Sequence, residues 1–275
     1  MHQTIDISYF NLFLGYLLLI IPLVVFYHYK THLVKDSLVA VLRMTIQLLV
    51  VGLYLEILFE YNDAWINSAW WIIMVVVAAF TIVRRASLKR KYFLIPLFIS
   101  LAISLFLIDL YFLGIIIELD YAFESRYFIP ISGILLGNCL KTNILGLNTF
   151  YKKLHSEITL YRYYLANGAT RSEALIPFMR EGLRTAFNPL IAGISVIGLI
   201  SLPGMMTGQI LGGSSPNVAI KYQIMLMMAI FVSTVISVIL TIIISNNFVF
   251  DKYGNVKTGV MKSSSTASRK ETKKL

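Results

Sequence analysis

Long apolar runs separated by short polar segments dominate the pattern of this chain. A window of about 20 mainly apolar residues with few charges is long enough to cross the hydrocarbon of a bilayer as a helix. Such windows lie at residues 9–29, 38–59, 68–83, 93–113, 127–149, 187–210 and 218–246. The pattern therefore predicts an all-α, polytopic integral membrane protein with about seven transmembrane helices.

The charges between these windows predict the orientation of the chain. Cytoplasmic loops of membrane proteins collect lysine and arginine. All but four of the 24 basic residues lie in alternate segments between the windows or after the last window. The other loops are acidic and contain Glu60, Asp63, Glu118, Asp120 and Glu124. We therefore expect an external N-terminus, a cytoplasmic C-terminus and a multi-pass protein of the cell (inner or plasma) membrane.

Composition excludes several classes of protein. With 57% hydrophobic and 14% charged residues and a mean hydropathy of +0.75, the chain has too few polar groups to cover a soluble domain. Basic loops beside an anionic leaflet account for the net charge of +10, so membrane lipids are expected partners and nucleic acid is not. Cys139 is the only cysteine, which excludes an intrachain disulfide and a cysteine metal cage. No cofactor is indicated, and the residues of any metal site stay unknown.

The chain divides into a transmembrane body and a tail. Residues 1–254 contain all the apolar windows. Residues 255–275 are rich in Ser, Thr and Lys and poor in apolar residues, which predicts a disordered basic cytoplasmic tail.

One polar segment, at about residues 150–186, is long enough to form a structure of its own outside the membrane. Apolar residues recur at helical spacing from Leu154 to Leu165. Asn167 and Gly168 tolerate left-handed backbone and should end that helix. Thr170 precedes Glu173 by three residues, the capping-box spacing that begins a second helix, which should bend again near Pro177. The segment is thus a helical hairpin that either lies flat on the inner leaflet or docks another protein.

The sixth window is interrupted by the stretch LISLPGMMTGQILGGSSP, residues 199–216. Proline lacks an N–H and clashes with the preceding turn, so Pro203 should kink the helix and free carbonyl groups near Leu199. Irregular backbone at membrane depth persists only where protein or a water-filled cavity covers it, so we expect the break to face the interior of the bundle.

Such a break could line the path of a polar substrate. Its oxygen atoms and methionine thioethers offer ligands to ions, and Lys141 places an ionisable group in the fifth window. The candidate path residues are Ser201, Pro203, Gly204, Met205, Met206, Thr207, Gln209, Asn138 and Lys141. Two alternatives stay open: the kink serves helix packing, or Gly208, Gly212 and Gly213 form a contact between two copies.

Several motifs together resemble one known family. GNCLKTN (137–143), LANGATRSEA (165–174), LRTAFNPLI (183–191) and the stretch 198–225 are similar to the Fet-type (FetB-like) ABC transporter permease family, which includes bacterial iron-export permeases and plant aluminium-tolerance relatives. The resemblance implies a permease subunit that exports metal ions such as iron, pairs with a separate ATP-binding ABC subunit and forms a homodimer. It also implies that the hairpin couples to the ATPase through Glu157, Leu165, Asn167, Gly168, Ala169, Thr170, Arg171 and Glu173.

The chain itself has no phosphate-binding loop of the G-x-x-x-x-G-K-[ST] type, so ATP hydrolysis must come from a partner. Motifs of intramembrane enzymes such as H-E-x-x-H and G-x-S-x-G are also absent from the sequence, and we do not expect an enzyme. A permease for a nucleotide sugar or another small polar solute, and a passive channel or scaffold, remain as alternatives.

Overall fold

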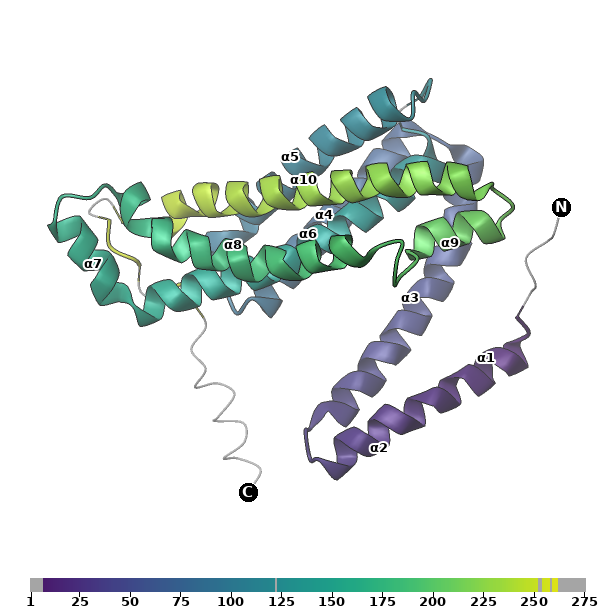
Figure 1. Cartoon of the computed structure of the whole chain (residues 1–275), viewed down its shortest axis with the longest axis horizontal. Coiled ribbons are helices and arrows are strands. Elements are labelled where there is room, and N and C mark those ends of the chain that lie inside the picture. The colour runs from purple at the N-terminus through teal and green to yellow at the C-terminus, as the bar shows by residue number, and fades with distance from the viewer. Residues whose placement is uncertain (1–6, 122, 252–253, 258, 262–275) are drawn as a thin grey trace.

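The structure is a computed structural model, and it describes residues 7–121, 123–251, 254–257 and 259–261. It is built from helices (Figure 1). The α-helices are α1 (Tyr9–Tyr16), α2 (Ile20–His28), α3 (Leu33–Tyr61), α4 (Ala64–Arg85), α5 (Arg90–Tyr111), α6 (Ser125–Ser156), α7 (Ile158–Ala166), α8 (Arg171–Val196), α9 (Gly204–Leu211) and α10 (Pro216–Val249). A 3-10 turn, Leu17–Leu19, joins α1 to α2, and a π-helical turn, Phe112–Ile116, extends α5.

Six helical segments of the described chain are long and apolar enough to cross a membrane. They are Tyr9–His28, Leu33–Tyr61, Ala64–Arg85, Arg90–Ile116, Ser125–Ser156 and Pro216–Val249. They confirm the polytopic all-α prediction and correspond to six of the expected windows. The remaining window, 187–210, is not one rod, because it is divided between the end of α8 and the short helix α9.

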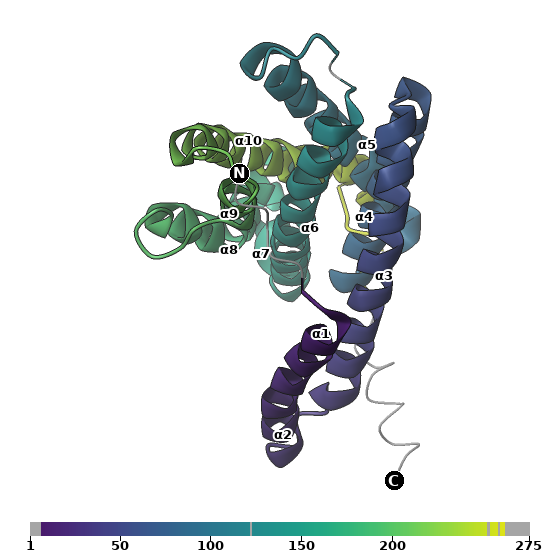
Figure 2. The same cartoon turned by 90° about the vertical axis from the view of Figure 1, so that its right-hand side faces the viewer.

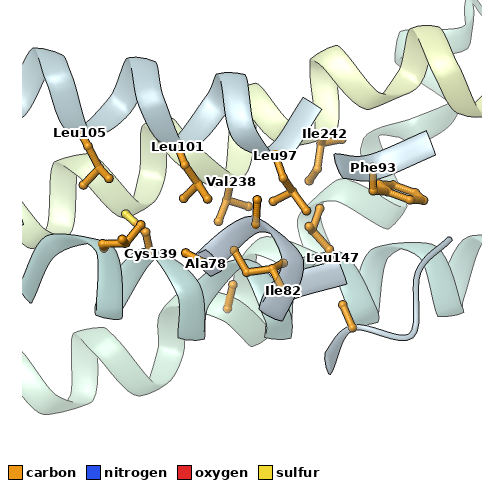
Figure 3. Close-up of a cluster of buried hydrophobic side chains, with 14 of the residues drawn as sticks. Ala78, Ile82, Phe93, Leu97, Leu101, Leu105, Cys139, Leu147, Val238 and Ile242 are labelled. Atoms are coloured by element: carbon orange, nitrogen blue, oxygen red, sulfur yellow. The ribbon is translucent and has the colours of Figure 1, made fainter. Parts of the chain in front are cut away.

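The core lies where α4, α5, α6 and α10 meet. Ile82, Leu101, Leu147 and Val238 each come from a different one of these helices and are fully buried. Figure 3 shows their side chains converging, with Cys139 in the same cluster. Figure 2 shows α8, α9 and α10 on one side of α6 and α3, α4 and α5 on the other. The buried stripe of α6 therefore joins the two sides into one bundle.

Helix α8 is held against α6 by a close crossing of small residues. A Cβ atom added at Gly182 would lie 3.1 Å from the carbonyl oxygen of Gly146 and 3.1 Å from the Cβ atom of Phe150. A Cβ atom added at Gly146 would lie 3.2 Å from the Cβ atom of Ala186. Small residues at such positions let two helix backbones approach closely. Helix α8 then continues unbroken through Pro177 and Pro189, so the bend expected near Pro177 does not end it.

Helices α1 and α2 and the N-terminal part of α3 form an arm that diverges from the bundle, whereas the other end of α3 packs on it through the buried Leu58 (Figure 1). Helix α2 packs on α3, and the hydroxyl groups of Tyr16 and Thr45 lie 2.6 Å apart. The membrane-length segments Tyr9–His28 and Leu33–Tyr61 each have an 18-residue apolar window in which no residue is buried. The arm therefore presents apolar surface along most of its length.

The chain beyond α10 packs back on the bundle. The backbone N–H of Lys89, between α4 and α5, donates a 3.1 Å hydrogen bond to the carbonyl oxygen of Val260. The N–H of Lys257 likewise bonds to the oxygen of Val249 at 2.9 Å. Residues 255–257 and 259–261, assigned above to the tail, thus belong to the packed body. The rest of the predicted tail, 258 and 262–275, lies outside the described residues.

Candidate functional site

The turn between α7 and α8 has the local structure that its sequence predicts. Gly168 has a φ of +88°, a left-handed conformation that glycine adopts without steric cost. The carboxylate of Glu173 accepts a 2.7 Å hydrogen bond from the N–H of Thr170, and the Thr170 hydroxyl accepts one from the N–H of Glu173 at 3.4 Å. This reciprocal capping box confirms the start of α8. Hydrogen bonds from the Thr170 hydroxyl and then from its N–H lower the pKa of Glu173.

The first helix of the hairpin also has the predicted buried face. Leu154 and Tyr161 are buried, and Ile158 and Leu165 are half-buried. The chain departs from α-helix at Glu157, so Leu154 belongs to the end of α6 and the other three to α7. The amphipathic pattern is therefore correct across a helix junction that the spacing alone did not reveal.

The segment that follows α10 contacts this hairpin. The Tyr161 hydroxyl donates a 2.8 Å hydrogen bond to the carbonyl oxygen of Gly254, and the Arg171 guanidinium lies 5.6 Å from the ring centre of Phe250. Burial raises the pKa of Tyr161, opposed by the charge of Arg171, so the hydroxyl keeps its proton and stays a donor. A cavity of about 590 Å³ lies here, lined by Thr170, Arg171, Ser172, Ile243, Asn246, Asn247, Asp251 and Gly254.

Most residues assigned to coupling lie at the turn between α7 and α8 and are exposed. Asn167, Gly168, Thr170, Arg171 and Glu173 are exposed, and Glu157, Leu165 and Ala169 are partly exposed. Glu157 lies 4.0 Å from Lys153, a distance at which an exposed ion pair contributes little to stability. The turn is thus rigid through its cap and its brace, and open to a partner.

The interruption of the sixth window lies earlier than predicted. Helix α8 ends at Val196, and Gly198 follows with a φ of +86°. The Gly198 N–H bonds to the carbonyl oxygen of Ser201 at 3.0 Å, which closes a tight loop. Pro203 then caps the start of α9 instead of kinking a continuous helix. The break expected at Pro203 is therefore a helix end at Val196, a loop that contains Gly198, and a new helix from Gly204.

The break is not covered by the rest of this chain. Leu199 is 88% exposed and Ile200 81% exposed, and Ser201 is exposed as well. The expectation that the interior of the bundle covers the break is wrong for a single chain, because α9 packs on α10 and leaves the loop 197–203 at the surface.

The remaining path candidates lie on two separate helices. Met205, Met206, Thr207 and Gln209 are half-buried on α9, where the Thr207 hydroxyl bonds to the carbonyl oxygen of Pro203 at 3.1 Å and Gly204 is exposed. Asn138 and Lys141 lie near the middle of α6, and Lys141 is exposed there. Among the hydrogen bonds of the described residues, none joins these two groups. The α9 residues therefore lie on one short helix, and Asn138 and Lys141 lie on another helix, α6.

An acidic side chain that the sequence analysis did not single out lies inside the bundle. Asp109 of α5 is only 2% exposed. Its Oδ2 atom accepts hydrogen bonds from Trp71 Nε1 at 3.2 Å and from Ser132 Oγ at 2.7 Å, so it links α4, α5 and α6. The π-helical turn Phe112–Ile116 continues the helix beyond Asp109, so the residue does not lie at the helix end.

A polar seam runs between α6 and α10. Asn143 donates a 2.7 Å hydrogen bond to Ser237, and the hydroxyl groups of Tyr151 and Ser245 lie 2.7 Å apart. The sequence contains a pattern that indicates this seam, because Ser233, Ser237, Thr241 and Ser245 recur every four residues on one helix face. Such bonds hold membrane helices together. No group of three or more His, Cys, Asp or Glu residues that could hold a metal occurs in the part of the chain that the structure describes.

Comparison with known proteins identifies the family. A family model described as "Uncharacterised protein family (UPF0014)" matches residues 9–250. The chain belongs to the UPF0014 family. This confirms the resemblance drawn from the motifs, because the family's members include Fet-type proteins. No solved structure matches the chain significantly.

Three UPF0014 relatives are informative. The "Probable iron export permease protein FetB" of Escherichia coli strain K12 is 32% identical over 84% of this chain and 89% of its own length. The "Protein ALUMINUM SENSITIVE 3" of Arabidopsis thaliana is 31% identical over 89% of this chain and 88% of its own. The "UPF0014 membrane protein YjkA" of Bacillus subtilis strain 168 is 26% identical over 91% and 98%. The chain is thus a multi-pass membrane protein with relatives named as a permease and as membrane proteins.

Proposed function

We propose that this chain is the permease subunit of an ABC transporter, and that it works as a homodimer with a separate ATP-binding subunit to export metal ions such as iron. The exposed, capped turn between α7 and α8 carries this proposal. The capping box and the hydrogen bond to Gly254 stiffen this turn, so a displacement by a bound ATPase would move α8 and would not merely deform the turn. The E. coli relative, named as an iron export permease, supports the class of substrate.

Helix α8 connects this turn to the break. It contains 26 residues, so it is about 39 Å long at roughly 1.5 Å per residue. The Gly146–Gly182 crossing fixes α8 on α6, and motion of the turn therefore reaches both helices and the loop at Gly198. The thioethers of Met205 and Met206, with the oxygen atoms of Ser201, Thr207 and Gln209, supply ligands for a metal passing this loop.

A second copy explains the surface that one chain leaves open. Exposed backbone at membrane depth needs cover, since each unsatisfied polar group in lipid costs several kcal/mol. Pairing two chains across loop 197–203, with Gly208, Gly212 and Gly213 nearby, supplies that cover and encloses a path. In this arrangement the N-terminus is outside and the C-terminus cytoplasmic, so the basic loops face the ATPase side.

The proposal is tested by ATP-driven transport. The chain and its ATPase are co-purified and reconstituted in vesicles, and flux is measured for a panel of metals and a nucleotide sugar. Gly168→Leu forces a bulky side chain into left-handed backbone, at a cost of about 1–2 kcal/mol, and should abolish ATP-driven flux. Gly52→Leu is the control, because Gly52 is exposed on α3 with nothing within 4 Å of an added Cβ atom.

The outcomes separate the alternatives. Loss of flux in Gly168→Leu with Gly52→Leu unchanged supports a coupled permease. A flux that is the same with and without ATP, and the same in Gly168→Leu as in the unmodified chain, identifies a passive channel and contradicts the proposal. ATP-driven movement of the nucleotide sugar with no metal flux overturns the substrate class but leaves the ABC mechanism standing.

A further inference from the structure

A second cavity, of about 700 Å³, lies between α2 and α3 where the two helices join. Its volume is within the range of about 300–1,000 Å³ that small-ligand sites occupy. The lining residues are Phe26, Tyr27, Lys30, His32, Val34, Lys35, Leu38 and Val39. The site therefore has apolar walls and a basic end.

The basic end has no carboxylate to neutralise it. Within the described residues, both ion pairs involve Lys153, so neither Lys30 nor Lys35 has a carboxylate oxygen within 4.0 Å. Asp36 follows Lys35 in sequence but does not line the cavity. Lys30, His32 and Lys35 all line the cavity, and ammonium groups are hydrogen-bond donors of the kind that a phosphate group accepts.

The walls and their surroundings are those of a lipid site. Leu38 and Val39 are about half exposed, and Tyr27 is 80% exposed beside the basic end. Tyrosine is enriched at the headgroup level of membranes, where its ring and its hydroxyl meet different media. Basic pockets between transmembrane helices recognise anionic lipid headgroups. The residues 262–275 are themselves basic, so charge repulsion excludes them as the occupant.

We propose that this cavity binds one anionic phospholipid per chain, with the phosphate at Lys30 and Lys35 and an acyl chain along Phe26, Val34 and Leu38. The lipid braces the arm at a joint where the chain turns sharply, with positive φ at Lys30 and His32. The inference stands on this cavity and does not depend on the transport proposal.

Native mass spectrometry of the full chain in detergent tests the site. The protein is titrated with phosphatidylglycerol, with zwitterionic phosphatidylethanolamine or with glycerol phosphate. One phosphatidylglycerol per chain should bind with high affinity, and Lys30→Gln/Lys35→Gln should weaken it about 30-fold, since each basic group near a lipid surface contributes roughly a factor of five. Lys30→Arg/Lys35→Arg keeps both charges and should bind the lipid as the unmodified chain does, and equal melting temperatures of the two variants show that the glutamine variant is folded.

Arg84→Gln/Arg85→Gln is the matched control, because it removes two exposed charges at a helix end without touching the cavity. Equal weakening in this control would reduce the effect to general surface attraction and overturn the proposal. Equal binding of phosphatidylethanolamine, or competition by glycerol phosphate at lipid concentrations, would overturn it as well. If Lys30→Gln/Lys35→Gln still binds the lipid but no longer forms a dimer, the cavity is occupied by a second copy of the chain and not by a lipid.

Discussion

The hydroxyl of Tyr161 in α7 donates a 2.8 Å hydrogen bond to the carbonyl oxygen of Gly254, beyond the end of α10. This bond ties the exposed hairpin to the segment that continues to Val260 and pairs with Lys89, between α4 and α5. The hairpin is therefore connected to the bundle by two routes, one through α6 and α8 and one through the C-terminal segment. We therefore expect a displacement of the turn to affect α4 and α5 as well as α8.

Tyr161→Phe should weaken the C-terminal route. The ring keeps its packing but the bond to Gly254 is lost, which lowers the free energy of local unfolding by about 1 kcal/mol. Hydrogen exchange of residues 158–166 and of 254–257 should rise together. Tyr163→Phe is the control, since Tyr163 is 62% exposed. Faster exchange in α7 alone, with 254–257 unchanged, would contradict the brace.

The start of α8 should fray in acid. The pKa of Glu173 is lower in the folded chain than in the unfolded chain, so folding favours the ionised form. Its stabilisation is complete above the unfolded pKa and is lost as the pH falls through the folded pKa. Hydrogen exchange of the first turn of α8 should therefore accelerate in that acidic range. Glu173→Gln keeps an acceptor for the cap and should remove this pH dependence; an unchanged pH profile would show that another group causes it.

The crossing of α6 and α8 should not tolerate added volume. Gly182→Leu must displace the Gly146 backbone or Phe150 and should cost about 1–3 kcal/mol, the range for overpacked cores. Gly193→Leu on the same helix meets nothing within 4 Å of its Cβ atom and should be tolerated. Thermal unfolding in detergent measures both. Equal melting temperatures would mean that α8 is not fixed on α6 at this point.

Asp109 should act as an acceptor that joins three helices. Asp109→Ala leaves Trp71 Nε1 without its partner in the interior and should cost about 1–3 kcal/mol. Asp109→Asn keeps a carbonyl oxygen and should cost less. Asp120→Ala, at an exposed position, should change stability by less than about 0.5 kcal/mol. In a double-mutant cycle with Trp71→Phe, additive losses would contradict a direct contribution of this hydrogen bond.

Some features set by local backbone chemistry could be predicted from the sequence, whereas the end of α8 and features set by neighbouring helices could not. The capping box of Thr170 and Glu173 depends on a spacing of three residues, so the sequence alone identifies it. The end of α8 was misplaced because Pro203 drew attention as a helix breaker, whereas Gly198 ends the helix by adopting positive φ. Proline fits the start of a helix, and Pro203 has that role for α9.

The burial of a polar side chain and the identity of the chain that covers a helix break are hard to predict from the sequence. Asp109 lies inside the predicted window 93–113, but the apolar pattern does not show that its side chain contacts α4 and α6. The break was expected inside the bundle because polar backbone in lipid needs cover, and that argument does not say which chain provides it. Leu199 and Ile200 are nearly fully exposed in one chain, so either lipid or a second protein chain must cover them.

Cysteine cross-linking decides what covers the break. Cys139 is the only cysteine and is fully buried, so Cys139→Ser gives a background without reactive thiols. In that background Leu199→Cys should form a cross-linked dimer in membranes, because two copies paired at loop 197–203 bring the two thiols together. Trp65→Cys is the control, since Trp65 is 85% exposed at the start of α4 and lies outside this loop. A dimer from both positions would reflect random collision, and a dimer from neither would leave the loop facing lipid. That second result would remove the physical basis for a path between two copies, because exposed carbonyl groups at membrane depth would then have no cover at all.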